Sequence, residues 1–299
     1  MKIITIAGVL AAAYFAAGGA PALAAGSAAT LEKIRSTGEV SLGYRETAVS
    51  FSYLNNEHQP TGFSLDLCHE IVAALKDKLD KPDLKVVFQP VTASNRIPLL
   101  VNGSIDIECG STTNTEERQK AVAFLYTTYL TGTKVLTRVD SGFKDLGDMK
   151  GKKIAVTIGT NNIKAVQRAS TEEGLAFELV YGQDHAENFL QLKNRRVDGM
   201  STDDILLSGL RADSGEPEAY TFTGPFLSTE PYAMMVRKDD PEFKSFADGV
   251  LKDLFQSGKF NEIYDKWFMK PVPPKNITFD IPMSPELAEL VKNPSDKGA

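Results

Sequence analysis

Apolar residues recur at two spacings along this chain, and the spacing distinguishes predicted helices from predicted strands. Within 62–79, Phe63, Leu67, Ile71 and Leu75 are placed to share one helix face. Short runs rich in Val, Ile and Thr, bounded by Gly, Asn or Pro, predict buried strands. The patterns predict helices at 62–79, 95–104, 160–174, 185–196, 203–215, 241–258 and 259–268, and strands at 39–44, 84–91, 105–110, 129–139, 152–159, 176–182, 197–202 and 231–240.

The order of these elements repeats once along the chain. In each half, strands alternate with helices, which indicates βαβ units and therefore an α/β fold with two mostly parallel sheets flanked by helices. The last strand, the two following helices and the Pro-rich segment 270–290 cannot bury themselves as a third domain. We therefore expect them to return to the first lobe. This predicts a discontinuous lobe of 25–131 plus 232–299, a second lobe of 132–231, and a hinge of two crossing segments.

The first residues of the chain form a pattern of their own. One early cation, Lys2, precedes an apolar run that ends in small residues around Ala24. This pattern predicts a signal peptide over 1–24, cleaved near Ala24, and export of the mature chain. A membrane anchor is the alternative, but the apolar run is short and is broken by Gly18, Gly19 and Pro21.

Charge and cysteine content narrow the function classes. The formal net charge is −6 for the full chain, and an acidic, evenly mixed surface argues against non-specific nucleic-acid binding. In an oxidising compartment, Cys68 and Cys109 can form a disulfide or remain two separately buried thiols. The histidines, His58, His69 and His185, are scattered, so we expect neither a metal site nor a cofactor.

The segment 108–124, ECGSTTNTEERQKAVAF, has two interpretations. The hydroxyls from Ser111 to Thr113 follow a predicted strand, and a single arginine, Arg118, comes five residues after Thr113. Hydroxyls and free N–H groups at a strand-to-helix turn suit an anion, which an arginine on the first helical turn can also reach. The alternative is an ordinary helix start, with Thr115 as the N-cap and a solvated Arg118.

Several motifs together resemble the periplasmic amino-acid-binding proteins of ABC importers, the family-3 solute-binding type. The resemblance covers essentially the whole mature chain, and it is closest to the glutamate/aspartate-binding members. The motifs that carry it are GSTTNTEERQKAVAF (110–124), GYRE (43–46), NRIPLL (95–100), ECGSTTN (108–114), DDILL (203–207) and MKPVPPKN (269–276). This resemblance implies a two-lobed periplasmic-binding-protein fold of type II that closes around its ligand.

Residue by residue, the resemblance assigns the two charged groups of an amino acid. Arg118, with Ser111 and Thr113, would hold the α-carboxylate, and Thr160 would add a hydroxyl and a backbone N–H. Asp203 would accept hydrogen bonds from the α-ammonium. Elementary electrostatics agrees, because burying either charge of a zwitterion without a partner costs several kcal/mol.

The same resemblance implies a site for an anionic side chain. Relatives that bind basic amino acids tend to have an acidic group at the position of Arg45, whereas here that residue is a cation. Arg96 and His185 would converge on the same pocket, and such donors favour a carboxylate. The glutamate/aspartate-binding members often have Ser at the position of Ala93; here Ser94 either replaces it or faces solvent.

Each of these residues also has a structural interpretation. Arg96 can be a surface residue, Arg45 can form an ion pair with Glu46 at the rim, and His185 can be a solvated or capping residue at a helix start. Trp267, Phe124 and Phe255 are expected to pack in the core.

We therefore expect an exported, monomeric, non-enzymatic protein that captures L-glutamate or L-aspartate and delivers it to a membrane permease. The alternative from another class is an exported dehydratase of the same fold that acts on a prephenate-like acid, with Glu108 or Asp203 in proton transfer. A sensory role through a partner protein is a third possibility.

Overall fold

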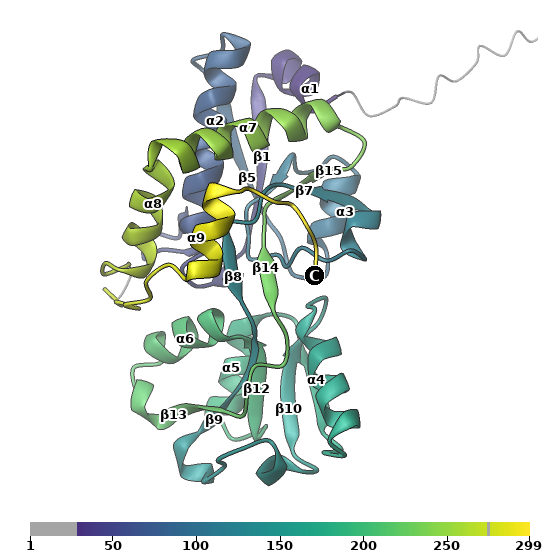
Figure 1. The fold of residues 1–299 in the computed structure, drawn as a ribbon, viewed down its shortest axis with the longest axis vertical. Coiled ribbons are helices and arrows are strands. Elements are labelled where there is room, and N and C mark those ends of the chain that lie inside the picture. Colours follow the sequence, from purple (N-terminus) through teal and green to yellow (C-terminus); the bar gives the residue numbers. More distant parts are fainter. Residues whose placement is uncertain (1–28, 274–275) are drawn as a thin grey trace, which may run out of the picture.

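Two α/β units, one above the other, are connected by a pair of extended strands (Figure 1). This computed structural model describes residues 29–273 and 276–299. The signal peptide predicted for 1–24 lies outside the described residues. The N-terminal and C-terminal parts of the chain both belong to the first unit, and the middle of the chain forms the second (Figure 1).

The first unit is built on a five-stranded sheet. Strands β1, β5 and β6 are parallel neighbours, with Glu39 opposite Lys85, while β15 is antiparallel to both β6 and β7. The strand order is β5 (Lys85–Pro90), β1 (Glu39–Tyr44), β6 (Ile107–Glu108), β15 (Met235–Arg237) and β7 (Val122–Phe124). Four of the five strands thus run in one direction, as the alternation of strands and helices predicts.

Helices from both ends of the chain cover this sheet. They are α1 (Thr30–Thr37), α2 (Phe63–Leu79), α3 (Arg96–Val101), α7 (Pro241–Ser257), α8 (Lys259–Phe268) and α9 (Pro285–Lys292). The side chains of α2, α7 and α8 share one apolar cluster with β1, and α3 packs in a second cluster with β7 and β15. Trp267, Phe124 and Phe255 are all buried, so their predicted place in the core is confirmed.

The second unit repeats the design. Its strand order is β11 (Glu178–Gly182), β10 (Lys153–Thr157), β12 (Gly199–Asp203), β9 (Thr133–Arg138) and β13 (Tyr220–Thr223), and its helices are α4 (Asn162–Glu172), α5 (His185–Lys193) and α6 (Asp204–Asp213). Along β10, Ile154 and Val156 face one apolar cluster and Ala155 faces another. This alternation places a helical layer on each face of the sheet.

The connection between the units consists of β8 (Tyr129–Thr131) and β14 (Glu230–Tyr232), which pair antiparallel. The single strands predicted at 129–139 and 231–240 are therefore wrong, because each is divided between this pair and a sheet. Gly132 marks one division: a Cβ there would lie 2.4 Å from the carbonyl oxygen of Ser228. Tyr129 of β8 and Tyr232 of β14 both pack against Phe51 of the first unit, with ring centroids 4.9 and 5.1 Å from its ring.

Other elements differ from the sequence predictions. The helix expected around Arg118 is a single 3-10 turn, Arg118–Lys120, and the Pro-rich segment 270–290 runs into α9. The helix expected at 95–104 is shorter, and the strand expected at 105–110 contains only two paired residues. A small sheet of β2 (Thr47–Ala48), β3 (Ser52–Leu54) and β4 (Pro60–Thr61) was not predicted, nor were α1, β7 and β13. Short 3-10 turns lie at Val139–Ser141, Gly147–Met149 and Pro217–Ala219.

Within the described ranges, none of the helices combines the length and the apolar character needed to span a bilayer.

Candidate ligand-binding site

The predicted site residues follow the carboxyl ends of the parallel strands in both units. In the first unit, Arg45 comes directly after β1, Arg96 begins α3 after β5, and Ser111 follows β6. In the second unit, His185 begins α5 after β11 and Asp203 ends β12. Because the carboxyl ends of parallel strands meet at one sheet edge, each unit directs its polar loops toward the other.

These loops surround one narrow cavity between the units. Seven of the eight residues predicted for the site line it. The lining residues are Arg45, Arg96, Ser111, Thr113, Thr160, Asn161, Asn162, His185, Thr202, Asp203 and Leu206. The eighth predicted residue, Arg118, lines the adjoining groove at the mouth of the cavity, together with Gly159 and Thr160.

The two arginines of the cavity are buried, and some of their donors have no partner in the part of the chain that the structure describes. Arg45 and Arg96 are each 2% exposed. Nη2 of Arg45, Nε and Nη1 of Arg96, and Oγ of Ser111 are buried and have no hydrogen-bond partner among the described residues. Since buried polar groups in proteins are normally hydrogen-bonded, this group of donors points to an external acceptor.

The pKa values of the arginines reflect the same environment. Burial, followed by the positive charge of Arg96, lowers the pKa of Arg45 to about 10. Burial also lowers the pKa of Arg96 itself. The surface interpretation of Arg96 is therefore wrong. The rim ion pair of Arg45 with Glu46 is wrong too, because Arg45 is buried, Glu46 is exposed, and no ion pair joins them in the described part of the chain.

Arg118 joins the two units at the mouth of the cavity. Its Nη1 donates to the carbonyl oxygen of Thr113 at 2.8 Å, and its Nη2 donates to the carbonyl oxygen of Gly159 in the second unit at 3.0 Å. Burial, and then the charge of Arg96, lowers the pKa of Arg118 to about 10. The hydroxyl of Thr115 accepts from the backbone N–H of Arg118 at 3.2 Å. The capping contact proposed for Thr115 is therefore present, and Arg118 nevertheless lies beside the cavity.

The acid side of the cavity is fully partnered. Oδ1 of Asp203 accepts from Nδ2 of Asn162 at 2.7 Å, and Oδ2 accepts from the hydroxyl of Tyr232. Burial and the neighbouring Glu230 raise the pKa of Asp203 to about 7. Glu230 itself accepts from Nδ2 of Asn161 at 3.1 Å. A carboxylate held in this way still has lone pairs for a further donor.

His185 is buried at the start of α5 and neutral. Burial, together with the charges of Arg45 and Arg96, holds its pKa well below the ordinary value. Its Nδ1 lies 2.9 Å from the hydroxyl of Thr157, which accepts from Asn188 at 2.8 Å. The hydroxyl of Thr157 can donate its proton to Nδ1, and in that tautomer Nε2 carries the ring proton. The N-cap of α5 is Asp184, not His185.

Thr160 and Ser94 contribute less than the sequence suggests. The hydroxyl and the backbone N–H of Thr160 both donate to the carbonyl oxygen of Thr157, at 2.7 and 3.2 Å. Its donors are therefore engaged within the second unit. Ser94 is exposed, and its hydroxyl lies 3.0 Å from that of Thr92, whereas Ala93 is buried.

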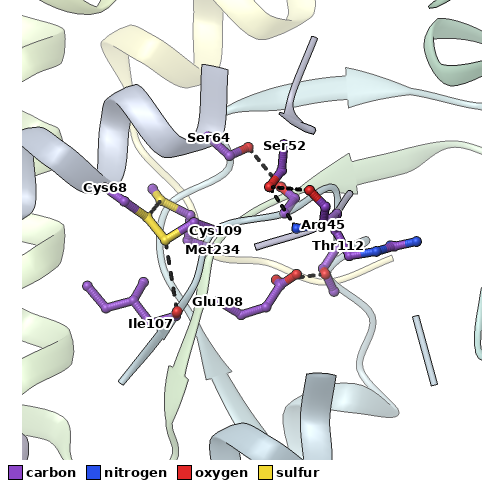
Figure 2. Close-up of a disulfide and its surroundings, with 10 residues drawn as sticks. Arg45, Ser52, Ser64, Cys68, Ile107, Glu108, Cys109, Thr112 and Met234 are labelled. Carbon is purple, nitrogen blue, oxygen red and sulfur yellow. Dashed lines mark hydrogen bonds between the residues drawn. A yellow bond between two sulfur atoms is a disulfide. The ribbon is translucent and has the colours of Figure 1, made fainter. Parts of the chain in front are cut away.

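A disulfide anchors the loop that carries the first-unit hydroxyls. Cys68 in α2 is bonded to Cys109, with Cα atoms 6.3 Å apart. Figure 2 shows this bond next to the segment that continues to Thr112, whose hydroxyl donates to Glu108 at 2.8 Å. Ser64 of α2 also donates to the carbonyl oxygen of Gly110 at 2.7 Å. Of the two possibilities for the cysteines, the structure has the disulfide.

Residues far along the chain support the same loop from outside. The backbone N–H of Ala299 donates to the carbonyl oxygen of Asn114 at 3.0 Å. Nδ2 of Asn114 and Nε2 of Gln119 each donate to the carbonyl oxygen of Asp296 at 2.8 Å. The tail therefore holds the segment that lies between Thr113 and Arg118.

The sequence prediction missed several residues of the site. Asn161, Asn162, Thr202 and Leu206 line the cavity, and Tyr232 reaches Asp203 from the connecting strand β14. Asn161 and Asn162 directly follow Thr160 at the start of α4, so the sequence around Thr160 could have identified them as candidates. Nothing local marks Tyr232, because its partner is 29 residues away.

Comparison with known proteins places this architecture in a family. Residues 40–270 match bacterial extracellular solute-binding proteins, family 3. The chain is 41% identical over 281 residues to an L-glutamate/L-aspartate-binding protein of Pseudomonas aeruginosa, covering 94% of this chain and 93% of that protein. It is 42% identical to a glutamate/aspartate import solute-binding protein of Salmonella typhimurium, covering 93% and 91%.

Solved structures agree on the fold. A mutant of ArgBP from T. maritima superimposes with a TM-score of 0.69 at 29% sequence identity, covering 80% of this chain and 98% of that one. The two sheets, the paired connecting strands and the polar cleft are thus those expected of the type II periplasmic-binding-protein fold. The chain belongs to the bacterial extracellular solute-binding proteins, family 3.

Proposed function

We propose that this protein captures L-glutamate or L-aspartate between its two units and delivers it to the membrane permease of an ABC importer. The observation that carries the proposal is the charge pattern of the cavity. On one side lie guanidinium donors of Arg45 and Arg96 that have no partner among the described residues, and the carboxylate of Asp203 lies on the other. An acidic amino acid has two carboxylates and one ammonium, and it matches both sides.

Each charged group of the ligand has a proposed partner. Arg118, Ser111 and Thr113 hold the α-carboxylate, with Thr160 closing that end of the cavity, and Asp203 accepts from the α-ammonium. The side-chain carboxylate lies against Arg45 and Arg96. A charge-assisted hydrogen bond contributes about 1.5–3 kcal/mol. Micromolar affinity corresponds to about 8 kcal/mol, so a few such bonds suffice.

His185 completes the side-chain site as a neutral donor. A protonated imidazole beside two buried guanidinium groups would add a third unpaired charge, and its lowered pKa indicates that the ring stays neutral. The Nε2–H group can then donate to the side-chain carboxylate. A ligand amide in place of this carboxylate would leave the two arginines with only Glu108 as a shared counter-charge among the described cavity neighbours, so glutamine is disfavoured.

Capture and release require that the units separate. We infer that 132–231 form one lobe, that 25–131 and 232–299 form the other, and that β8 and β14 are the hinge between them. A ligand that contacts both lobes binds the closed form better, and therefore shifts the population toward it. The permease then receives a shape that is populated mainly when ligand is bound.

The protein has no proposed catalytic step. Both oxygens of Asp203 already accept hydrogen bonds, and Glu108 lies outside the residues that line the cavity, with Thr112 as its donor. Among the residues that line the cavity, the dehydratase alternative therefore has no acid with a free oxygen. The curated relatives at about 41% identity are named as binding proteins.

We further propose that the mature protein is a periplasmic monomer, produced by cleavage near Ala24. The cavity needs no second copy of the chain, because residues of one chain line both of its sides. Size-exclusion chromatography with light scattering, and N-terminal sequencing of protein secreted to the periplasm, test these two points.

Isothermal titration calorimetry on the mature protein tests the central proposal. L-Glutamate and L-aspartate should bind with one-to-one stoichiometry, and L-glutamine should bind at least about 100-fold more weakly because it lacks the second carboxylate. L-Arginine serves as the opposite-charge control and should not bind. Equal affinity for glutamine and glutamate would contradict the role of the arginine pair.

A further inference from the structure

The two units also touch at a point away from the cavity, where Val49 meets Gly209. Val49 belongs to the turn between β2 and β3 of the first unit, and Gly209 lies in α6 of the second unit. On α6, Leu206 lines the ligand cavity, and Gly209 is three residues further on, so both face the first unit. The contact is therefore connected to the cavity through one helix.

The absence of a side chain at Gly209 allows this approach. A Cβ at this position would lie 2.8 Å from Cβ of Val49 and 3.0 Å from its Cγ1. Carbon atoms pack best at about 3.5–4.0 Å. Because Cβ of Val49 is bonded directly to the backbone, rotation of the side chain cannot remove the overlap. A methyl group on Gly209 would instead have to push the units apart.

Glycine is not required at this position by the helix itself. Gly209 is absent from the residues with positive φ, and alanine is the better helix former. Gly159, on the α4 side of the cleft, is different. It has φ +82°, and a Cβ there would lie 2.6 Å from Cα of Ser94, so its substitution would combine backbone strain with the interlobe contact. Figure 1 shows α6 and α4 on opposite sides of the second unit.

We propose that the Val49–Gly209 contact determines ligand affinity by setting how far the lobes can close, although neither residue lines the ligand cavity. The inference rests on the proposed capture function. Asp203 precedes α6 directly, so a helix held away from Val49 also holds this carboxylate away from the first-unit arginines. A ligand that must bridge both sides then binds with less favourable free energy, while the open form loses nothing.

The first test is Gly209→Ala in the full mature protein, measured by calorimetry with L-glutamate and L-aspartate. Affinity should fall about tenfold or more. The melting temperature of the ligand-free protein should stay the same or rise, because alanine favours the helix. Gly249→Ala is the matched control: it is an exposed glycine in α7 whose added Cβ has no atom within 4 Å. Its affinity should equal that of the wild type.

The second test is rescue from the other side of the contact. Val49→Ala removes Cγ1 but keeps the Cβ at 2.8 Å, so Gly209→Ala combined with Val49→Ala should recover affinity only partly. The combination of Gly209→Ala with Val49→Gly removes both contacts and should return affinity to within about threefold of Val49→Gly alone. Small-angle scattering should show that Gly209→Ala contracts less on ligand addition than the wild type.

The outcomes separate the inference from the proposed function. A wild type that binds no acidic amino acid overturns the proposed function. A wild type that binds, together with a Gly209→Ala variant of equal affinity, overturns only the inference. The inference also fails if Val49→Gly does not rescue the variant, or if Gly209→Ala lowers the melting temperature of the ligand-free protein, since either result would mean a general packing defect.

Discussion

The two sides of the cleft are prepared for the ligand in opposite ways. On the first-unit side, donors of Arg45, Arg96 and Ser111 are buried and unpartnered among the described residues. On the second-unit side, Asp203 has a donor on each carboxylate oxygen, and His185 is bonded to Thr157. On one side these donors have no acceptor among the described residues, and on the other Asp203 and His185 already belong to a hydrogen-bonded network.

This difference separates the roles of the two lobes. Glu108 is the one buried acid that acts on both arginines in the described part of the chain, so we expect an entering anion to favour the closed form on the arginine side. The acid side positions a single acceptor and needs little rearrangement to use it. The arginine side is also cross-linked by Cys68–Cys109, whereas the acid side depends on hydrogen bonds. Four predictions test this comparison, from the largest expected effect to the smallest.

The disulfide should contribute most to stability. It joins residues 41 apart in sequence, and this loop contains Arg96. The double variant Cys68→Ala/Cys109→Ala should lower the free energy of unfolding by about 3–4 kcal/mol, because the unfolded chain regains the entropy of that loop. Urea unfolding followed by circular dichroism measures it. A loss below about 1 kcal/mol would contradict a stabilising role for the cross-link.

The arginines should matter to binding and not to folding. Arg45→Met and Arg96→Met keep the aliphatic stem and remove the charge, so each should weaken glutamate binding at least about 100-fold, or about 2.7 kcal/mol. The ligand-free melting temperature should change little, since the loss of a buried charge offsets the loss of its attraction to Glu108. Arg35→Met, at an exposed ion pair with Glu32, is the control and should change neither value. Retained affinity with lost stability would assign the arginines to the fold instead.

Asp203→Asn should weaken binding about 10–100-fold, because one charge-assisted bond to the ammonium is lost. Its pH dependence is more diagnostic. Burial and Glu230 raise the pKa of Asp203 to about 7, so wild-type affinity should increase as the pH rises from about 6 to 8 and the carboxylate forms. Calorimetry across this range should show a flatter profile for the variant.

The stability of the ligand-free protein should follow the opposite course. Because the folded pKa exceeds the unfolded value of about 3.9, Asp203 contributes stability below pH 4 that is lost as the pH rises through 7. His185, with its lowered pKa, contributes stability that is lost as the pH falls below about 6.5. Both proteins contain His185, so the difference between wild type and Asp203→Asn isolates Asp203. Parallel melting curves at every pH would contradict the assignment.

Tyr232→Phe should have the smallest effect, about 3–10-fold on affinity, because it removes one hydrogen-bond donor to Asp203. The pH at which binding strengthens should also move to higher values, since that donor lowers the pKa of the carboxyl group. Tyr53→Phe is a suitable control, because its hydroxyl donates to Pro273 and not to the cleft. An unchanged pH profile would show that the connecting strand does not act on Asp203.

Strongly periodic segments were predicted well from sequence, and their edges less well. The helix at 259–268 and the strand at 39–44 have the predicted bounds, because a complete apolar face leaves only one way to bury them. The segments 129–139 and 231–240 failed because they change pairing partners in mid-course. That change depends on a second segment about 100 residues away, which no local pattern contains.

For the site, local sequence identified the residue types and their place at strand ends. The burial of Arg45 and Arg96 could not be read from the residues alone, since a surface position was equally compatible with the pattern. Tyr232 and the tail that supports Asn114 were missed, because their partners come from distant parts of the chain. The roles of the eight predicted residues toward a ligand stay predictions until the variants are measured.

The sequence by itself determined the repeated α/β units, the strand-end position of the polar residues and, through the resemblance of its motifs, an acidic amino acid as the expected ligand. These follow from spacing and residue chemistry, which are local. Only the tertiary structure decided that two arginines share a buried cavity, that Asp203 accepts from a tyrosine of the connecting strand β14, and that Val49 lies against Gly209. Such properties depend on distances between segments far apart in the chain, where burial changes the energy of a charge and a single methyl group changes how closely two lobes can meet.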